Sequence, residues 1–293
     1  MRFFRYTLLL LIIFTSILHA QSKSDPFKGK FAVAKTNTPV LNTKDFRAVF
    51  GGERGNKIKT DKHGFIRELE FIALEKSVFE ILASYKEDDY FIFKVKTNEY
   101  PTNTSLFIDS RFVEVKDKRP EDRIKSDFSV ETVQDALESL EGYPYMWGGN
   151  FAEGIPELLK YYPPEVELSD SEEFLWCLKG VDCSGLLYQA TGGKTPRNSS
   201  ALIHFGEPVE IEDKDIDEII DILKPLDIIG WNGHVMTVLN DKFIIESSPS
   251  KGVHRTEIKK RLQWLLKERT PVNDWDSSSG NRFVVRRWID TYK

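Results

Sequence analysis

Apolar and polar residues follow two different patterns on either side of a charged segment at residues 119–127. In residues 22–118 the apolar residues alternate with polar ones or form short runs that end at Gly, Asn, Asp or Pro. Such runs are typical of β-strands, and a series of them predicts a small barrel or sandwich. The clearest runs are 30–34, 65–84 and 90–96. We therefore expect an all-β domain at residues 22–118, with a hairpin turn at 86–89.

Helical and strand patterns alternate in residues 128–293, after the linker that we place at 119–127. Ser129 is a suitable N-cap for a helix, and a second helix is predicted to start at Cys183 and to end before Gly192. Later residues predict an antiparallel meander, a helix and a last strand. These are the strands 226–231, 233–239 and 243–247, the helix 256–267 and the strand 282–289. The predicted fold class of this part is α+β.

The first 20 residues have the layout of a cleaved secretory signal. Arg2 and Arg5 precede the apolar run 8–14, and small residues follow near Ala20. A retained N-terminal anchor is the alternative, although the apolar stretch is short for a span of about 20 residues. No later stretch is apolar enough to span a membrane. We expect export to the periplasm, the cell envelope or the medium.

Charge and cysteine content narrow the possible functions. The formal charge is −5, and it becomes −7 when Arg2 and Arg5 leave with the signal. An acidic exported protein is a poor candidate for nucleic-acid binding. The two cysteines and the histidines lack the paired spacings of a zinc site, so we expect neither metal nor cofactor. Cys177 and Cys183 could instead pair as a disulfide, which would block a nucleophilic role for Cys183.

Cys183 is the candidate nucleophile. It follows Gly180, Val181 and Asp182 at the predicted start of a helix. A helix N-terminus carries unpaired N–H groups and a partial positive charge, and both favour thiolate over thiol. The alternative is a buried structural thiol, because free cysteine is among the most buried residue types.

His234 is the candidate base, because it opens a strand and lies on the same strand face as Met236. If the following turn uses residues 240–242, Met236 lies opposite Glu246, which becomes a diagonal neighbour of His234. A two-residue turn would place Ser247 opposite His234 instead. Glu246 is chemically the better orienting group, because a carboxylate stabilises an imidazolium. An ordinary strand histidine is the alternative.

Five segments together resemble the NlpC-type, papain-like cell-wall cysteine peptidases. In chain order they are Pro144-Tyr145-Met146-Trp147-Gly148-Gly149, Val181-Asp182-Cys183-Ser184-Gly185-Leu186, Pro196-Arg197-Asn198-Ser199, Leu226-Asp227 and Gly233-His234-Val235. The likeness covers about residues 128–250. The preceding β domain resembles the bacterial SH3-type barrels often fused to these enzymes. This resemblance implies a compact α+β domain in which a nucleophile-bearing helix packs on an antiparallel sheet that carries the base.

The resemblance also implies the roles of individual residues. Cys183 would be the nucleophile, His234 the base, and Tyr145 a phenol near the oxyanion, beside the Cys183 backbone N–H. Relatives with an N-terminal barrel often require the free amine of L-Ala, which Asp182 and Ser184 would bind here. The other substrate contacts that it implies are Trp147, Arg197 and Ser199.

Three features depart from the family pattern. The third polar residue of the site is usually His, Asn or Gln, whereas this chain has Glu246. Asn198 stands where relatives often have Asp. Residues 150–178 are an insertion with three prolines and seven acidic side chains. One hypothesis makes this insertion an acidic flap over the substrate cleft, and the alternative is a solvated decoration.

We therefore expect an exported, monomeric cysteine endopeptidase that acts on peptidoglycan stem peptides or muropeptides. It would cleave the amide between γ-D-glutamate and a diamino acid through a thioester. One alternative is a non-catalytic envelope protein that binds wall peptides. The other is a cysteine amidase or acyltransferase acting on another amide, against which the charge of Asp182 argues when the substrate is a lipid.

Overall fold

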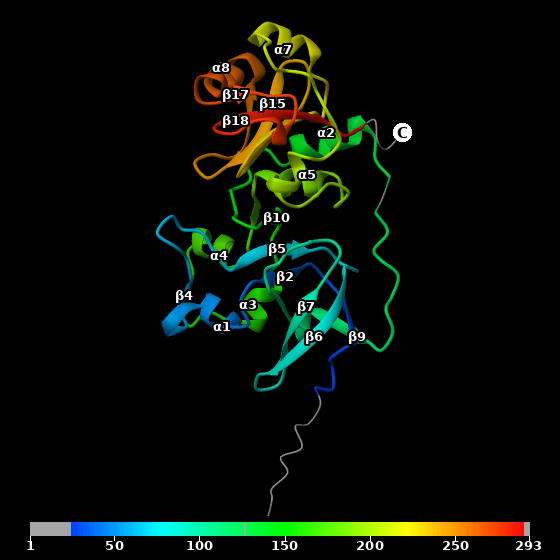
Figure 1. Cartoon of the computed structure of the whole chain (residues 1–293). Helices are drawn as coiled ribbons and strands as arrows, with labels where there is room; N and C mark the ends of the chain where they lie inside the picture. The colour runs from blue at the N-terminus through cyan, green and yellow to red at the C-terminus, as the bar shows by residue number, and fades with distance from the viewer. Residues whose placement is uncertain (1–24, 126, 290–293) are drawn as a thin grey trace, which may run out of the picture.

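The computed structural model describes residues 25–125 and 127–289, drawn in colour in Figure 1. The signal predicted at residues 1–20 lies outside the described residues. Two large sheets dominate the chain, one on each side of the linker. Within the described residues, no helix is both long enough and apolar enough to cross a membrane.

The N-terminal sheet has seven strands, all paired antiparallel, in the order β5-β2-β8-β7-β6-β1-β9. Its all-β character and the β6–β7 hairpin confirm the predicted strand pattern, while the SH3-type arrangement stays a prediction. The strands are β1 (Phe31–Ala34), β2 (Thr38–Leu41), β5 (Leu69–Ala73), β6 (Val78–Lys86), β7 (Phe91–Lys96), β8 (Leu106–Asp109) and β9 (Val113–Lys116). The small elements beside them are α1 (Phe46–Val49), β3 (Phe50–Gly51), η1 (Gly52–Arg54), β4 (Lys57–Ile58) and η2 (Ser110–Phe112). We call residues 25–116 the β region.

The C-terminal sheet runs β12-β18-β13-β14-β15-β16 with antiparallel pairs, and β17 joins β18 in parallel. Its strands are β12 (Glu207–Pro208), β13 (Ile228–Trp231), β14 (His234–Val238), β15 (Phe243–Ser248), β16 (Gly252–Glu257), β17 (Thr270–Pro271) and β18 (Arg282–Arg287). The other elements here are α2 (Val130–Ser139), α5 (Cys183–Ala190), α6 (Ser199–Leu202), α7 (Ile216–Ile222), α8 (Ile258–Glu268) and η3 (Trp275–Ser277). The predicted helix 256–267 starts two residues too early, because Thr256 and Glu257 pair with β15.

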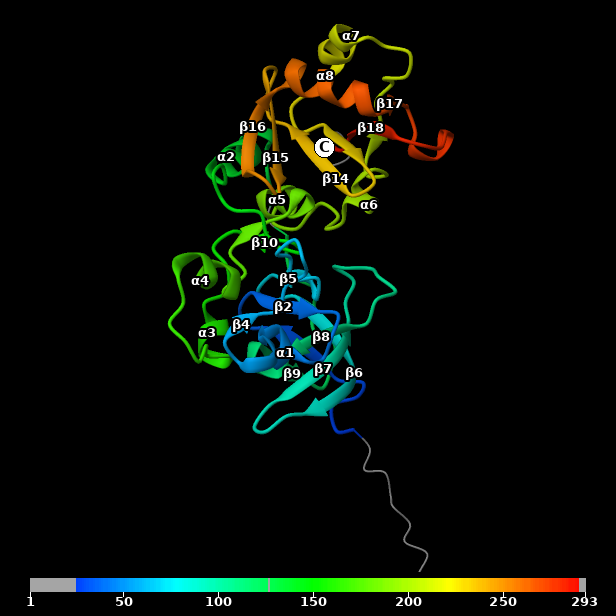
Figure 2. The same ribbon diagram turned by 90° about the vertical axis from the view of Figure 1, so that its left-hand side faces the viewer.

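Helices cover both faces of the C-terminal sheet (Figure 2). Adjacent side chains of a strand point to opposite faces. In β14, Val235 therefore packs with the α2 and α5 side chains, whereas Met236 packs with those of α7 and α8. A helix that starts at Cys183 thus lies on an antiparallel sheet that carries His234, which is the predicted architecture.

The linker contacts both parts of the molecule. Residues 117–125 and 127–128 contain no helix or strand. The Arg123 guanidinium donates to the Gly192 carbonyl at 2.9 Å and lies 3.4 Å from the Glu99 carboxylate. The linker is therefore tied to the end of α5 on one side and to the β region on the other.

The insertion packs against the β region and does not cover the cleft. It contains β10 (Asn150–Phe151), which pairs with β11 (Gly180–Val181), and the helices α3 (Glu157–Tyr161) and α4 (Asp170–Trp176), which Figure 1 shows beside α1 and β4. Tyr162 stacks on Phe46 and Phe50, and its hydroxyl donates to the buried Asp109 at 2.6 Å. The flap hypothesis is therefore wrong, and so is the solvated decoration, because side chains of the insertion complete the β-region core.

Candidate active site

Asp182 determines where α5 begins and leaves one backbone donor open. As the N-cap, its Oδ1 accepts hydrogen bonds from the N–H groups of Ser184 at 3.1 Å and Gly185 at 2.7 Å. The Cys183 N–H has no partner among the described residues. An unpaired N–H beside a nucleophile can donate to a developing oxyanion.

Glycine at position 185 brings α5 close to the aromatic segment. A Cβ at Gly185 would lie 2.0 Å from the Gly149 carbonyl oxygen. Any side chain there would therefore push the helix away from residues 145–149. The close approach places Cys183 and Tyr145 on the lining of the same cavity.

His234 and Glu246 come together as the three-residue turn predicts. β14 and β15 pair Thr237 with Ile245, and this register places Met236 opposite Glu246. The His234 Nε2 lies 2.6 Å from the Glu246 Oε2. Since Nε2 is engaged, Nδ1 is the ring nitrogen left for the thiol.

The His234 ring is hydrogen-bonded to both Cys183 and Glu246. Burial alone would lower its pKa, but these two hydrogen bonds and the associated charges outweigh burial and raise the pKa to about 9. His234 is therefore protonated at neutral pH. An imidazolium beside a cysteine favours the thiolate form, which is the nucleophile.

Arg261 of α8 is a member of this array that sequence reasoning missed. Its Nε donates to the Glu246 Oε1 at 2.7 Å and its Nη2 to Oε2 at 2.9 Å. Burial would raise the pKa of Glu246, but the hydrogen bonds from His234 and Arg261 lower it to about 2. Glu246 is therefore ionised at every pH at which His234 can act as an acid or base. No motif marks Arg261, because α8 meets Glu246 only through the fold.

Tyr145 and Trp147 lie on the wall next to Cys183. Burial raises the pKa of Tyr145 well above its ordinary value, and the nearby charges of Asp182 and Cys183 act in the same direction. The phenol therefore remains a hydrogen-bond donor. The Trp147 ring is 37% exposed and stacks against Phe65 of the β region.

Asp182, Ser184 and Arg197 form a closed internal network. The Arg197 side chain is buried and donates to Asp182 Oδ1 at 2.9 Å and to Oδ2 at 2.7 Å. It also donates to the Ser184 Oγ at 2.9 Å and to the Asn150 Oδ1 at 2.9 Å. The predicted substrate contacts at Asp182, Ser184 and Arg197 therefore already have partners within the protein. Ser199, the first residue of α6, lies on the cavity wall as expected.

The cavity that Cys183 lines has a volume of about 190 Å³, and both parts of the chain line it. The β region contributes Arg67, Leu69, Glu70 and Tyr100. The Glu70 carboxylate accepts hydrogen bonds from the Tyr100 hydroxyl at 2.9 Å and from the Asn42 Nδ2 at 2.9 Å. Sequence reasoning missed these residues, because the β region carries no motif of its own.

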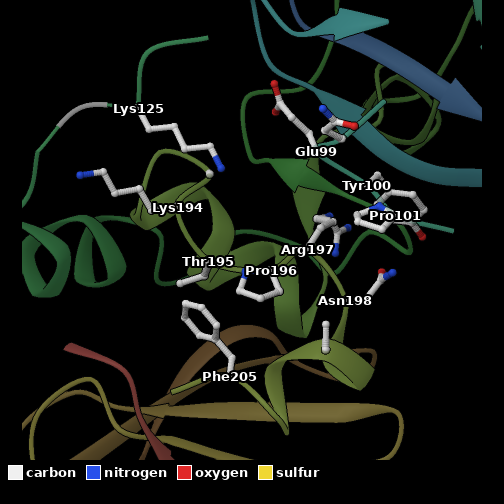
Figure 3. A pocket seen from close by; sticks show the side chains of 13 residues that line it. Glu99, Tyr100, Pro101, Lys125, Lys194, Thr195, Pro196, Arg197, Asn198 and Phe205 are labelled. Carbon is white, nitrogen blue, oxygen red and sulfur yellow. The ribbon is translucent and has the colours of Figure 1, made fainter. Parts of the chain in front are cut away.

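A larger cavity of about 350 Å³ is lined by Tyr100 and Arg197 among other residues (Figure 3). The linker contributes Lys125, whose ammonium points into it, and the β region contributes Glu99. No cysteine or histidine lines this cavity. Of these two cavities, the smaller one is lined by the candidate nucleophile Cys183.

Both cysteines are free thiols, so the Cys177–Cys183 disulfide is not formed. Cys177 is buried, and burial raises the pKa of its thiol, so it is a poor nucleophile. Among residues 25–125 and 127–289, no group of three or more His, Cys, Asp or Glu side chains is arranged to hold a metal ion.

No family model matches the sequence, and no curated protein matches it. The similar solved structures include an NlpC/P60 family protein from Bacillus cereus, 15% identical, with a TM-score of 0.33. The match covers 89% of this chain, which spans 64% of the length of the Bacillus protein. The P60 domain of an antigen from M. avium paratuberculosis is 19% identical over 44% of this chain and 82% of its own, with a TM-score of 0.31.

RipD from Mycobacterium tuberculosis is described as a non-catalytic NlpC/p60 domain protein adapted to peptidoglycan binding. It is 17% identical over 55% of this chain and 98% of its own, with a TM-score of 0.33. Two of these three structures carry the NlpC/P60 name, and the third is a P60 domain.

Proposed function

We propose that this chain is a cysteine peptidase that cleaves the amide between γ-D-glutamate and a diamino acid in peptidoglycan stem peptides or muropeptides. The observation that carries the proposal is the hydrogen-bonded array of Cys183, His234 and Glu246, in which Cys183 lines a cavity. A nucleophile, a base and an orienting group in this order are the requirements for acyl transfer. The resemblance of the five sequence segments supports the choice of bond.

The proposed reaction starts from the Cys183 thiolate beside the His234 imidazolium. The thiolate attacks the γ-carbonyl carbon, and the oxyanion receives hydrogen bonds from the Cys183 N–H and the Tyr145 phenol. His234 then gives its proton to the leaving amine, which departs as the diamino-acid fragment. A thioester remains on Cys183. Neutral His234 next deprotonates a water molecule that hydrolyses the thioester and restores the thiolate.

The ammonium of a free N-terminal L-Ala needs a carboxylate partner. Asp182 was expected in this role, but both its oxygens have partners within the protein, including Arg197. Among the described residues, the donors to Glu70 are the neutral groups of Tyr100 and Asn42, and Glu70 lines the same cavity. We therefore assign the ammonium to Glu70, and we assign Asp182 and Arg197 to holding the start of α5 in place.

Ser199 lines the cavity and completes the proposed peptide site. Trp147 adds an exposed aromatic ring to the lining of the same cavity. Export through the signal at residues 1–20 would bring the enzyme to its substrate, as a monomer and without a cofactor. These assignments follow the expectations drawn from the sequence.

The test is incubation of the full chain with L-Ala-γ-D-Glu-diaminopimelate and with its lysine counterpart, followed by mass analysis. The proposal requires the dipeptide L-Ala-D-Glu and the free diamino acid as products. An N-acetylated peptide is the control, and it should be cleaved more slowly. Binding of these peptides without any product would overturn the proposal and favour the non-catalytic wall-peptide-binding alternative.

A thiol-reactive probe at neutral pH gives a second readout. A reactive thiolate labels quickly, whereas a buried thiol does not. We expect labelling of Cys183 and not of Cys177. Absence of label at Cys183 would contradict the proposed chemistry even if a contaminating activity gave products.

A further inference from the structure

Arg67 places a guanidinium on the wall of the catalytic cavity, in a position that the proposed reaction does not use. Its guanidinium carbon lies 4.0 Å from the centroid of the Trp147 ring and 4.8 Å from that of Phe65. The same cavity is lined by Cys183 and Tyr145. The guanidinium therefore lies over two neighbouring aromatic rings that stack on each other, one from each part of the chain.

One edge of this guanidinium remains available. The Nε of Arg67 donates to the Asp61 Oδ2 at 2.6 Å. Among residues 25–125 and 127–289, neither terminal nitrogen of Arg67 has a hydrogen-bond partner. The side chain is 42% exposed, so the open edge can be reached. Guanidinium groups bind carboxylates with a planar fork of two N–H donors.

The other charges of the cavity give Arg67 a counterpart. Arg197 neutralises Asp182 within the protein, so Asp182 adds little to the field that a ligand meets. The Glu70 carboxylate lies on the side of Tyr100, while Arg67 lies on the side of Trp147. A cavity with one carboxylate and one guanidinium complements a ligand that carries both an ammonium and a carboxylate.

We propose that Arg67 binds a substrate carboxylate next to the scissile amide and makes the enzyme selective for peptides that keep this carboxylate free. This inference rests on the proposed peptidase function. Two carboxylates have the required chemistry. One is the α-carboxylate of the γ-linked D-glutamyl residue, on the acyl side of the scissile bond, and the other belongs to the diamino acid on the leaving side.

Three peptides distinguish the two sources. The reference is L-Ala-γ-D-Glu-diaminopimelate. The second peptide carries an α-carboxamide on the glutamyl residue, and the third carries a carboxamide in place of the diaminopimelate carboxylate next to the scissile amide. Each of the last two lacks one carboxylate. We expect kcat/KM of the wild-type chain to fall about 10- to 100-fold for the peptide that lacks the bound carboxylate, as for the loss of a charge-assisted hydrogen bond.

The variant Arg67→Met tests the assignment. It should lower kcat/KM for the reference peptide by about the same factor and leave the poor peptide almost unchanged, so that the discrimination disappears. Arg67→Lys keeps the charge but not the fork and should restore part of the discrimination. The matched control is Arg47→Met. Arg47 also pairs with an aspartate and lies over an aromatic ring, but it is outside the cavity. The Arg47→Met variant should therefore discriminate among the three peptides as the wild type does.

The outcomes separate this inference from the function on which it rests. Equal losses of kcat/KM for all three peptides in Arg67→Met, or unchanged discrimination among them, would show that Arg67 has only a structural role. Either result would overturn this inference and leave the peptidase proposal intact. Wild-type activity that ignores both carboxylates would do the same. Failure of the wild type to cleave any of the three peptides would overturn the peptidase proposal, and the role of Arg67 with it.

Discussion

The two walls of the catalytic cavity come from different parts of the chain and carry different kinds of groups. The C-terminal wall has Cys183, which is hydrogen-bonded to His234 and through it linked to the buried Glu246. The β-region wall has Arg67 and Glu70, whose side chains line the cavity. One wall can change the protonation of a reacting atom, and the other can only attract, orient or reject a ligand.

This difference separates chemistry from selection. Substitutions on the C-terminal wall should change kcat, because they alter groups whose charge changes during the reaction. Substitutions on the β-region wall should change KM and the ranking of substrates. The described residues of the insertion and the linker do not line the cavity. Substitutions in them should leave kcat and KM unchanged and should alter stability.

The largest effect is expected for Cys183→Ala. Removal of the nucleophile leaves no group that can form the thioester, so kcat should fall by about 10⁴-fold or more while the circular dichroism spectrum stays the same. The matched control is Cys177→Ala, which removes the other thiol and should keep its activity. Activity in Cys183→Ala within 10-fold of the wild type would show that Cys183 is not the nucleophile.

Glu246→Gln should lower kcat by about 10- to 100-fold and shift the pH profile. The carboxylate of Glu246 helps to raise the pKa of His234 to about 9, so wild-type kcat/KM should decline above about pH 9, when the imidazolium loses its proton. Without this carboxylate the pKa falls, and the basic limb should move down by about 1–3 pH units. Steady-state kinetics from pH 5 to 10 measures both effects.

The control for this shift is Glu141→Gln, which removes an exposed carboxylate that pairs with Arg255 instead. Its pH profile should match that of the wild type. A basic limb that stays in place in Glu246→Gln would mean that Glu246 does not set the protonation of His234.

Glu70→Gln should raise KM about 10-fold for peptides with a free L-Ala amine and leave kcat within about 3-fold. The reason is the loss of the carboxylate that pairs with the ammonium, while the amide keeps the shape of the side chain. An N-acetylated peptide should show no such change. Glu68→Gln is the control, because Glu68 lies two residues away and pairs with Lys59. Equal effects on free and acetylated peptides would reject the ammonium site.

Tyr162→Phe should have the smallest effect on catalysis and a measurable effect on stability. The lost hydroxyl donates to the buried Asp109, so we expect the free energy of unfolding to fall by about 1–2 kcal/mol. Activity should remain unchanged, because Tyr162 lies outside the cavity. Urea denaturation monitored by fluorescence provides the measurement.

Tyr161→Phe is the matched control for this substitution, since no described residue forms a hydrogen bond with the Tyr161 hydroxyl. A comparable loss of stability in both variants would show that the contact between Tyr162 and Asp109 does not hold the insertion to the β region. A large loss of activity in Tyr162→Phe would mean that the insertion acts on the site after all.

The catalytic wall could be predicted from the sequence because its geometry is local. An Asp before Cys183 is an N-cap, and the N-cap places the thiol in the first turn of a helix. Strand alternation and a three-residue turn are enough to put Glu246 beside His234. Each of these relations spans a dozen residues or fewer and depends on backbone geometry that few residue types change.

The β-region wall, Arg261 and the packing of the insertion were decided only by the tertiary structure. Arg67 meets Trp147 across 80 positions of the chain, and Tyr162 meets Asp109 across 53. Such contacts depend on how two sheets and their connections pack, and no spacing in the sequence encodes that. The sequence by itself thus determined where a nucleophile and its base lie, whereas folding determined which charges face them, because long-range packing places those side chains.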